Sequence, residues 1–238
     1  MAPFFPKSHG KPRVDDRRVL SGIIFINRNG LRWRDAPKEY GPHKTLYSRW
    51  KRWSEKGIFA KMMIGLTAEH GEEKTVMIDA TYLKAHRTAT NLAAKKGGRG
   101  RLIGRTKGGM NTKLHTICDS QGRPLNLFVT AGQVSDYIGA RALLSSLPNV
   151  DWLLGDRGYD ADWFREALQD KGIRACIPGR KQRKTPVKYD KRRYKRRNRI
   201  EIMFGRLKDW RRVATRYDRC PKVFLSAIAL AATVIYWL

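Results

Sequence analysis

Short apolar segments alternate with amphipathic helical segments from residue 75 onward, and this pattern restricts the fold more than any other feature of the chain. The apolar or alternating segments typical of strands are residues 75–83, 113–119, 124–130, 151–160 and 173–178. Helical patterns occupy residues 135–147 and 161–172, and two more helices follow a basic loop after residue 178. The resulting order, β-β-β-α-β-α-β-α-α, predicts the α/β class, with a mixed sheet and flanking helices.

Residues 1–70 differ from this pattern and are predicted to form a small helical domain. One helix ends at Asn29-Gly30, and a second runs from Lys44 to Gly57 with an apolar stripe that contains Trp50. Two short helices with a basic second member resemble a helix-turn-helix DNA reader, although a helical hairpin with a solvated charged face has the same pattern. The predicted domains are therefore 1–70, helical and DNA-binding, and 71–238, α/β, with a basic glycine-rich loop at about 87–109.

The charge of the chain indicates a polyanionic partner. Fifty Lys and Arg against 21 Asp and Glu give a net charge of +29. A folded protein tolerates such self-repulsion mainly when it binds a polyanion, and nucleic acid is the leading candidate because phosphate neutralisation releases counterions. A ribosomal-type or histone-type structural protein would have the same charge, so charge alone does not indicate an enzyme.

The cysteines and the last residues of the chain argue against a disulfide-rich, a cysteine zinc-binding or a membrane-spanning protein. Cys118, Cys176 and Cys220 are widely spaced, which indicates neither a disulfide framework nor a cysteine zinc site and suits a reducing cytoplasm. Residues 223–238 are apolar, but a bilayer span needs about 20 such residues. We therefore expect a buried C-terminal helix and no membrane partner.

Three acidic residues stand at positions suited to catalysis. Asp79 lies at the end of the first predicted strand and Asp156 at the end of the fourth, and in open α/β sheets sites gather at strand ends. Each could instead be a local turn cap. Glu201 lies in a lysine- and arginine-rich segment, on the same predicted helix face as Tyr194, Arg197 and Lys208. The alternative role for Glu201 is an i,i+4 ion pair with Arg197.

A cluster of carboxylates beside bound DNA would suit metal-assisted phosphodiester cleavage. Two divalent ions about 4 Å apart stabilise both the attacking and the leaving oxygen. Mg²⁺ prefers oxygen ligands and keeps part of its water, so a few carboxylates suffice. The surrounding cations would keep Glu201 ionised and hold the DNA backbone nearby.

These residues resemble the DDE transposases with an RNase H-like fold. Tyr194, Arg197, Glu201 and Lys208 match the Y-x2-R-x3-E-x6-K motif of IS4/IS5-type insertion-sequence enzymes at every spacing. Further resemblance to the IS5 family covers nearly the whole chain, in "RWRDAP", "IDATYLKAHR", "GRTKGGMNTKLH", "LLGDRGYDAD" and "RRVATRYDR". Relatives usually have a further N-terminal stretch, so we expect a truncated or late-started reading frame.

The resemblance implies a transposase that binds the terminal inverted repeats of its element, cleaves there and joins the freed end to target DNA. Asp79, Asp156 and Glu201 would be the catalytic metal ligands, for two Mg²⁺ ions that Mn²⁺ could replace. Tyr194, Arg197 and Lys208 would position the phosphate backbone. The residues expected to recognise the element's ends are Lys44, Thr45, Ser48, Arg49 and Arg52. The expected partner is double-stranded DNA, bound by a homodimer or higher oligomer in the bacterial cytoplasm.

Two other functions remain open from the sequence. One is a non-catalytic basic DNA-binding protein that derives from such an enzyme. The other is an RNase H-like nuclease that cuts without joining. An intact acidic triad argues against the first, and the helical N-terminal domain together with the four-residue helix motif argues against the second.

Overall fold

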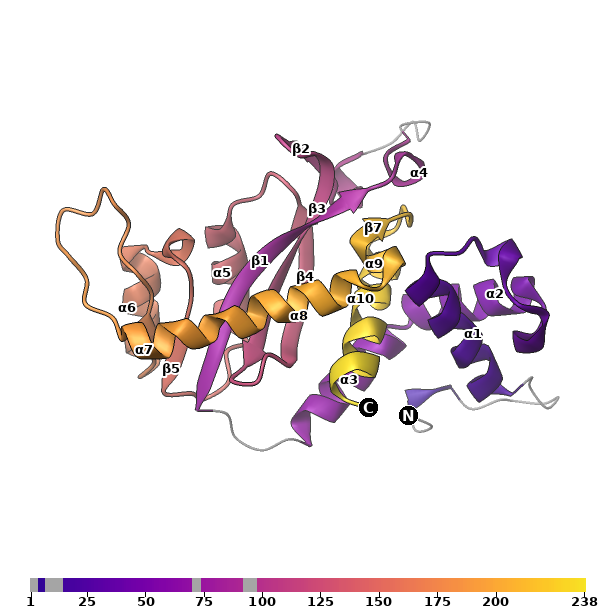
Figure 1. Ribbon diagram of the computed structural model, residues 1–238, viewed down its shortest axis with the longest axis horizontal. Coiled ribbons are helices and arrows are strands. Elements are labelled where there is room, and N and C mark those ends of the chain that lie inside the picture. Colours follow the sequence, from indigo (N-terminus) through magenta and orange to yellow (C-terminus); the bar gives the residue numbers. More distant parts are fainter. Residues whose placement is uncertain (1–3, 7–14, 70–73, 92–97) are drawn as a thin grey trace. The chain divides into compact units, whose positions relative to one another are not determined.

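The computed structural model describes residues 4–6, 15–69, 74–91 and 98–238, which divide into two compact units (Figure 1). Unit 1 comprises residues 1–67, 83–101 and 206–238, and unit 2 comprises residues 68–82 and 102–205. Strand β1 (Thr75–Ala85) and helix α8 (Asn198–Lys208) each begin in unit 2 and end in unit 1. The two-domain division at residue 70 stays a prediction, and the compact units divide the chain at other points.

Unit 1 contains the predicted N-terminal helices. Helix α1 (Asp16–Asn29) begins where the Asp15 carboxylate accepts the Arg17 N–H, and it ends at Gly30, which is left-handed at φ 71°. Helix α2 (His43–Glu55) is followed by α3 (Ile58–Ala68), with Gly57 at φ 65° between them. The short elements of this unit are η2 (Trp33–Asp35), η3 (Lys38–Tyr40), α4 (Arg87–Thr90), η4 (Gly98–Arg101), α9 (Arg211–Ala214) and β7 (Thr215–Arg216).

Aromatic side chains form much of the core of unit 1. Trp50 and Trp53 are fully buried on α2 and both contact Phe59 of α3, with ring centroids 5.1 and 6.3 Å apart. The apolar stripe predicted from the sequence is therefore the packed face of α2. Truncation of such a ring to alanine usually costs about 3–5 kcal/mol, so these residues are central to the stability of the helical unit.

The C-terminal segment is a buried helix, as predicted. Helix α10 (Pro221–Tyr236) begins with proline at its first turn, and its residues from Ala227 to Ala232 are all buried. It packs against α1 and α2 inside unit 1. Within the described part of the chain, no helix is both long and apolar enough to cross a membrane.

Unit 2 is built on the mixed sheet predicted for an RNase H-like fold. The strand order is β2 (Gly104–Thr106), β3 (Gly109–Asp119), β1, β5 (Trp152–Leu154) and β6 (Arg174–Cys176), and β4 (Pro124–Ala131) pairs with β3. Strands β1, β5 and β6 are parallel, whereas β3 is antiparallel to both β2 and β4. Helices α5 (Asp136–Leu144) and α6 (Asp162–Asp170) contribute Leu143 and Phe164 to the core that covers β1 and β5.

The glycine-rich segment is more ordered than the sequence suggested. Residues 87–109 were expected to form one loop, but 87–90 are helical and 104–106 form β2, which pairs with β3 through a tight turn at residues 107–108, and Gly109 at the start of β3 has a φ of 93°. Pairing along β3 satisfies the backbone polar groups of residues 104–106, which a composition-based prediction does not take into account. Residues 92–97 of the expected loop lie outside the described residues.

Close packing between α5 and the sheet leaves little room for a side chain at Gly139. A Cβ atom there would lie 2.1 Å from Nδ1 of His115. That ring is fully buried, stacks on Phe128 with centroids 4.7 Å apart, and lies 2.8 Å from the Thr130 hydroxyl through Nε2. It therefore has little freedom to move away.

Gly139→Ala is expected to lower the free energy of unfolding by about 1–3 kcal/mol, the usual cost of overpacking a core. Urea denaturation of the purified protein measures this. Gly205→Ala is the matched control, because Gly205 lies in α8 and a methyl group added there would meet no neighbouring group within 4 Å, so the change should be neutral or stabilise by about 0.5–1 kcal/mol. Equal effects of the two substitutions would contradict the proposed contact.

Candidate active site

Asp79 and Asp156 lie at the same level of neighbouring parallel strands. Met77 of β1 is the register partner of Leu154 of β5, and each aspartate follows its strand partner by two residues. Adjacent strands are about 4.8 Å apart, so the sheet itself brings these two carboxylates together. The prediction that both lie at strand ends is confirmed for Asp156, which follows the end of β5 at Leu154, but it is wrong for Asp79, which lies in the middle of β1 because that strand continues to Ala85.

Each aspartate uses one carboxylate oxygen locally and leaves the other for the site. Oδ1 of Asp79 accepts the Ala80 N–H at 2.8 Å, and Oδ1 of Asp156 accepts the Gly158 N–H at 2.8 Å. The second of these bonds caps η5 (Arg157–Tyr159). The local capping considered from the sequence therefore exists, but it occupies only half of each carboxylate and is compatible with a second role.

Arg197 is the residue that joins the third acid to this pair. Its guanidinium lies 3.4 Å from Oδ2 of Asp79 and 2.8 Å from Oε1 of Glu201. The Arg197 side chain is 11% exposed and that of Asp79 is 15% exposed, whereas that of Glu201 is 63% exposed. The i,i+4 ion pair considered from the sequence is present, and the same arginine also binds Asp79. This second contact was not predicted, since nothing in the spacing of the two residues indicates it.

The packing of α8 explains how Glu201 comes to face the sheet carboxylates. Ile200, Met203 and Leu207 are buried at 0–1% exposure, which confirms the predicted apolar stripe. The preceding residues form α7 (Lys191–Tyr194) and the 3₁₀ turn η6 (Lys195–Arg197), so Arg197 ends a 3₁₀ turn and Glu201 lies in the first turn of α8. A negative charge near a helix N-terminus is favourable.

Asp79 has an unusually high pKa for an aspartate. The pKa of Asp79 is raised to about 6, chiefly by burial and also by the charges of Asp156 and Glu201, although Arg197 and the Ala80 N–H act in the opposite direction. A carboxyl group that is costly to ionise, with like charges beside it, is typical of functional sites. The three carboxylates together therefore carry more negative charge than Arg197 alone can compensate.

The other two members of the helix motif have different surroundings. Tyr194 is half-buried, packs edge-on against Tyr189 at 5.5 Å, and has the Arg197 guanidinium 6.0 Å from its ring. Lys208 lies seven residues after Glu201 in the part of α8 that belongs to unit 1, and burial lowers the pKa of its ammonium group. Their predicted contacts with phosphate stay predictions.

The residues expected to recognise the element's ends all lie on α2. Lys44, Ser48 and Arg52 are exposed and Thr45 is half-buried. Arg49 differs, because its guanidinium is 2.6 Å from the Asp16 carboxylate and lies over the Trp53 ring at 5.8 Å. This side chain joins α2 to α1, so Arg49 supports the helical unit whether or not it also contacts DNA.

Two carboxylates paired with one arginine, a third carboxylate just after the neighbouring strand of a mixed sheet, and a strongly basic chain fit the DDE class of DNA-processing enzymes that the sequence motifs resemble. Residues 70–237 match the family described as "Transposase DDE domain", and residues 1–63 match "Putative transposase of IS4/5 family". The chain therefore belongs to the IS4/5 family of DDE transposases, as its motifs predicted.

Individual relatives agree with this assignment. The chain is 36% identical over 128 residues to a putative transposase for insertion sequence element IS6501 of Brucella ovis, which covers 53% of this chain and 98% of the relative. It is 28% identical over 156 residues to a putative transposase for IS402 of Burkholderia cepacia, at 58% and 72% coverage. Among solved structures, the Mos1 strand transfer complex matches 72% of this chain and 60% of that chain, at 12% identity and a TM-score of 0.29.

The DDE domain implies divalent metal ions, and the donor atoms present are of the right kind. Carboxylate oxygens suit hard ions such as Mg²⁺. Across residues 4–6, 15–69, 74–91 and 98–238, however, no group of three or more His, Cys, Asp or Glu lies close enough to hold a metal ion. The carboxylates that would hold the ions are those of Asp79, Asp156 and Glu201, and in this arrangement the guanidinium of Arg197 contacts two of them, Asp79 and Glu201.

Proposed function

We propose that the protein binds the terminal inverted repeats of its insertion sequence and catalyses phosphodiester hydrolysis followed by strand transfer into target DNA. The observation that carries the proposal is the convergence of Asp79 and Glu201, 122 positions apart in the chain, on one guanidinium, with Asp156 beside Asp79 at the neighbouring strand end. Family membership supports it independently.

The proposed reaction has two steps at phosphorus. Water attacks the phosphodiester at the element's end, the bond from phosphorus to the 3′-oxygen breaks, and a 3′-hydroxyl is released. That hydroxyl then attacks a phosphodiester of the target, forms a new phosphorus–oxygen bond and displaces the target's 3′-oxygen. Two Mg²⁺ ions, or Mn²⁺ in their place, would supply stabilisation of the attacking and leaving oxygens. A dimer or larger oligomer would pair the two ends on double-stranded DNA.

In this proposal the guanidinium of Arg197 moves from its carboxylate partners to a DNA phosphate. In the free protein its guanidinium neutralises Asp79 and Glu201. A DNA phosphate offers the same bidentate acceptor geometry as a carboxylate, so bound DNA competes for the guanidinium. Movement of the Arg197 side chain onto phosphate would release the carboxylates, which could then gather around the ions. Tyr194 and Lys208 would contact the same backbone.

The first test incubates the purified protein with Mg²⁺ and a labelled duplex that carries the inverted repeat found beside the gene. We expect nicked intermediates and strand-transfer products, which gel electrophoresis separates. Hydrolysis without joining would indicate a nuclease instead.

Salt-sensitive binding without cutting would indicate the second candidate, a non-catalytic DNA-binding protein. The specific observation in its favour is that the guanidinium of Arg197 already pairs with both Asp79 and Glu201 in the described structure. Repeating the reaction over a range of Mg²⁺ and Mn²⁺ concentrations separates a weakly bound metal from an absent activity, because a weak site becomes active at high metal concentration.

A further inference from the structure

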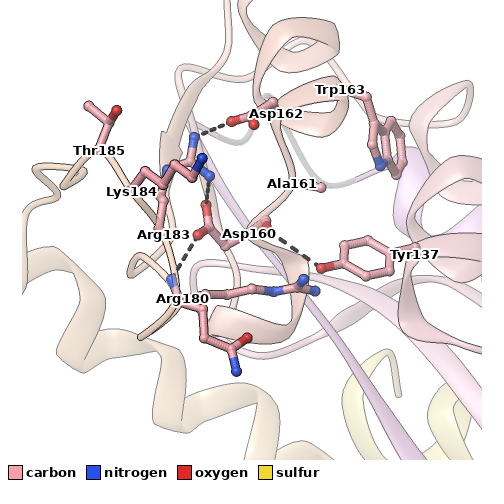
Figure 2. Close-up of a pocket in the computed structure, with 10 residues that line it drawn as sticks. Tyr137, Asp160, Ala161, Asp162, Trp163, Arg180, Arg183, Lys184 and Thr185 are labelled. Atoms are coloured by element: carbon pink, nitrogen blue, oxygen red, sulfur yellow. Dashed lines mark hydrogen bonds and ion pairs between the residues drawn. The ribbon is translucent and has the colours of Figure 1, made fainter.

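A polar cavity of about 670 Å³ lies beside the Asp156 loop in unit 2 and has no role in the function proposed so far (Figure 2). Figure 2 shows Arg183 and Lys184 on one side of it and the rings of Tyr137 and Trp163 on the other, with the Arg180 side chain extending toward the Tyr137 ring. The residues that line it are Tyr137, Asp160, Ala161, Asp162, Trp163, Arg180, Gln182, Arg183, Lys184 and Thr185.

Asp160 fixes the shape of this cavity. Its carboxylate is fully buried, with Arg165 Nε at 2.8 Å, Arg183 Nη1 at 3.1 Å and the Arg180 backbone N–H at 2.8 Å. Arg183 also binds the Asp162 carboxylate. A buried carboxylate with this many donors is satisfied internally. The segment after β6 is thereby tied to the loop before α6, and both acidic residues of the cavity are already neutralised.

The side chains of Arg180 and Lys184 take no part in these ion pairs. Arg180 lies over the Tyr137 ring at 4.7 Å and reaches the Gly158 carbonyl at 3.4 Å, and Lys184 lies beside Arg183 in Figure 2. Within the described parts of the chain, neither Arg180 nor Lys184 has a carboxylate at ion-pair distance. Both side chains belong to exposed residues. The cavity therefore exposes more positive than negative charge. Its walls are joined by the ion pairs of Asp160 and Asp162.

The cavity and the candidate active site share one short loop. Asp156 stands at its start, Asp160 at its end, and the Gly158 carbonyl that Arg180 contacts lies between them. Four residues span at most about 14 Å, and phosphates of one strand advance about 3.4 Å per nucleotide along a duplex. A DNA strand whose phosphate lies at Asp156 would thus reach the cavity within about four nucleotides.

We propose that this cavity binds the phosphate backbone of the DNA strand that passes through the active site, with Arg180 and Lys184 as the contacting cations. The inference rests on the proposed function and adds a second DNA contact, placed within about four nucleotides of the cleaved bond. Arg180 is held by its stacking on Tyr137, which reduces the entropy lost when a phosphate binds it.

DNA suits this surface better than an acidic protein does. A phosphodiester strand offers a charge at every nucleotide, and the cavity is lined by Asp160, at the other end of the short loop that begins with Asp156. The rings of Tyr137 and Trp163 add surfaces that a sugar or base can pack against. An acidic protein would need no such alignment with the active-site loop.

The test measures DNA binding without metal, in EDTA, by the full-length protein and by Lys184→Ala and the Arg180→Ala/Lys184→Ala double variant. The probe is the inverted-repeat duplex. Each phosphate contact contributes about 0.9 to the slope of log K against log salt concentration, so the slope should fall by about 0.9 in the single variant and about 1.8 in the double variant. Lys171→Ala, an exposed lysine of α6's C-terminal end outside the cavity, should leave the slope unchanged.

A second measurement locates the contact. Methylphosphonates, which remove one backbone charge, replace single phosphates within six nucleotides of the cleavage position. One within about four nucleotides should weaken binding by the wild type and not by the double variant. An unchanged slope, a sensitive position elsewhere, or equal competition by polyglutamate would overturn the proposal. If the wild type cleaves DNA while the variants bind normally, only this inference fails, whereas a wild type that binds no DNA removes the proposed function too.

Discussion

Replacing any one of the three acids by its amide, Asp79→Asn, Asp156→Asn or Glu201→Gln, is expected to lower the rate of strand cleavage about a thousandfold or more. Each change preserves the size of the side chain and removes one negative charge, either from Asp79 or Glu201, which pair with Arg197, or from Asp156, which follows the strand next to β1. Stabilisation of charge at phosphorus by ions held on carboxylates is worth several kcal/mol, and about 4 kcal/mol corresponds to a thousandfold in rate.

The same three variants should bind the inverted-repeat duplex as tightly as the wild type, or more tightly. Removing a negative charge beside a phosphate reduces repulsion, and the changes at Asp79 and Glu201 also free Arg197 from one of its two carboxylate partners. Rates are measured on a labelled duplex with Mg²⁺, and affinities in EDTA. Glu166→Gln is the matched control, because Glu166 is an exposed acid on α6, and this variant should cleave at the wild-type rate. A triad variant with normal cleavage would remove that residue from the proposed site.

The neighbouring positions of the candidate carboxylates Asp79 and Asp156 were predictable in part from local rules. Each acid follows an apolar run, and the strand-end rule holds for Asp156, whereas β1 continues past Asp79 to Ala85. The structure adds the register that puts Met77 opposite Leu154, which no single segment encodes. The buried stripe of α8 was likewise predictable from a spacing of three and four residues, since packing of one helix face depends mainly on that spacing.

Contacts between distant segments were not predictable. The pairing of Arg197 with Asp79 joins residues 118 positions apart, and the cavity around Asp160 depends on arginines that looked like ordinary members of a basic run. Composition alone would predict that all of these arginines bind DNA. The structure divides them into those that neutralise buried acids, such as Arg165 and Arg183, and those that remain for a ligand, such as Arg180. Only tertiary packing makes that distinction.

The same physical chemistry predicts that Asp79→Asn stabilises the folded protein while it abolishes cleavage. The pKa of Asp79 is raised to about 6 in the folded protein, chiefly by burial, from an ordinary value near 3.8. A group with a raised folded pKa contributes stability that is complete below pH 3.8 and is lost as the pH rises through about 6. At pH 8 the wild type therefore carries the full cost of an ionised, buried carboxylate. At about 1.4 kcal/mol per pKa unit, that cost is up to about 3 kcal/mol.

Urea unfolding at a series of pH values measures the difference between wild type and Asp79→Asn. The variant should be more stable by up to about 3 kcal/mol at pH 8, and this advantage should shrink through pH 6 and disappear near pH 4, because the neutral amide does not titrate. Asp170→Asn, at an exposed position on α6, is the control and should change stability by less than about 0.5 kcal/mol at any of these pH values. A variant less stable than the wild type at pH 8 would mean that the ion pair with Arg197 outweighs the burial of the carboxylate. The Asp79–Arg197 pair would then be a structural salt bridge. The ionised Asp79 carboxylate would carry no net unfavourable energy that a bound cation could relieve.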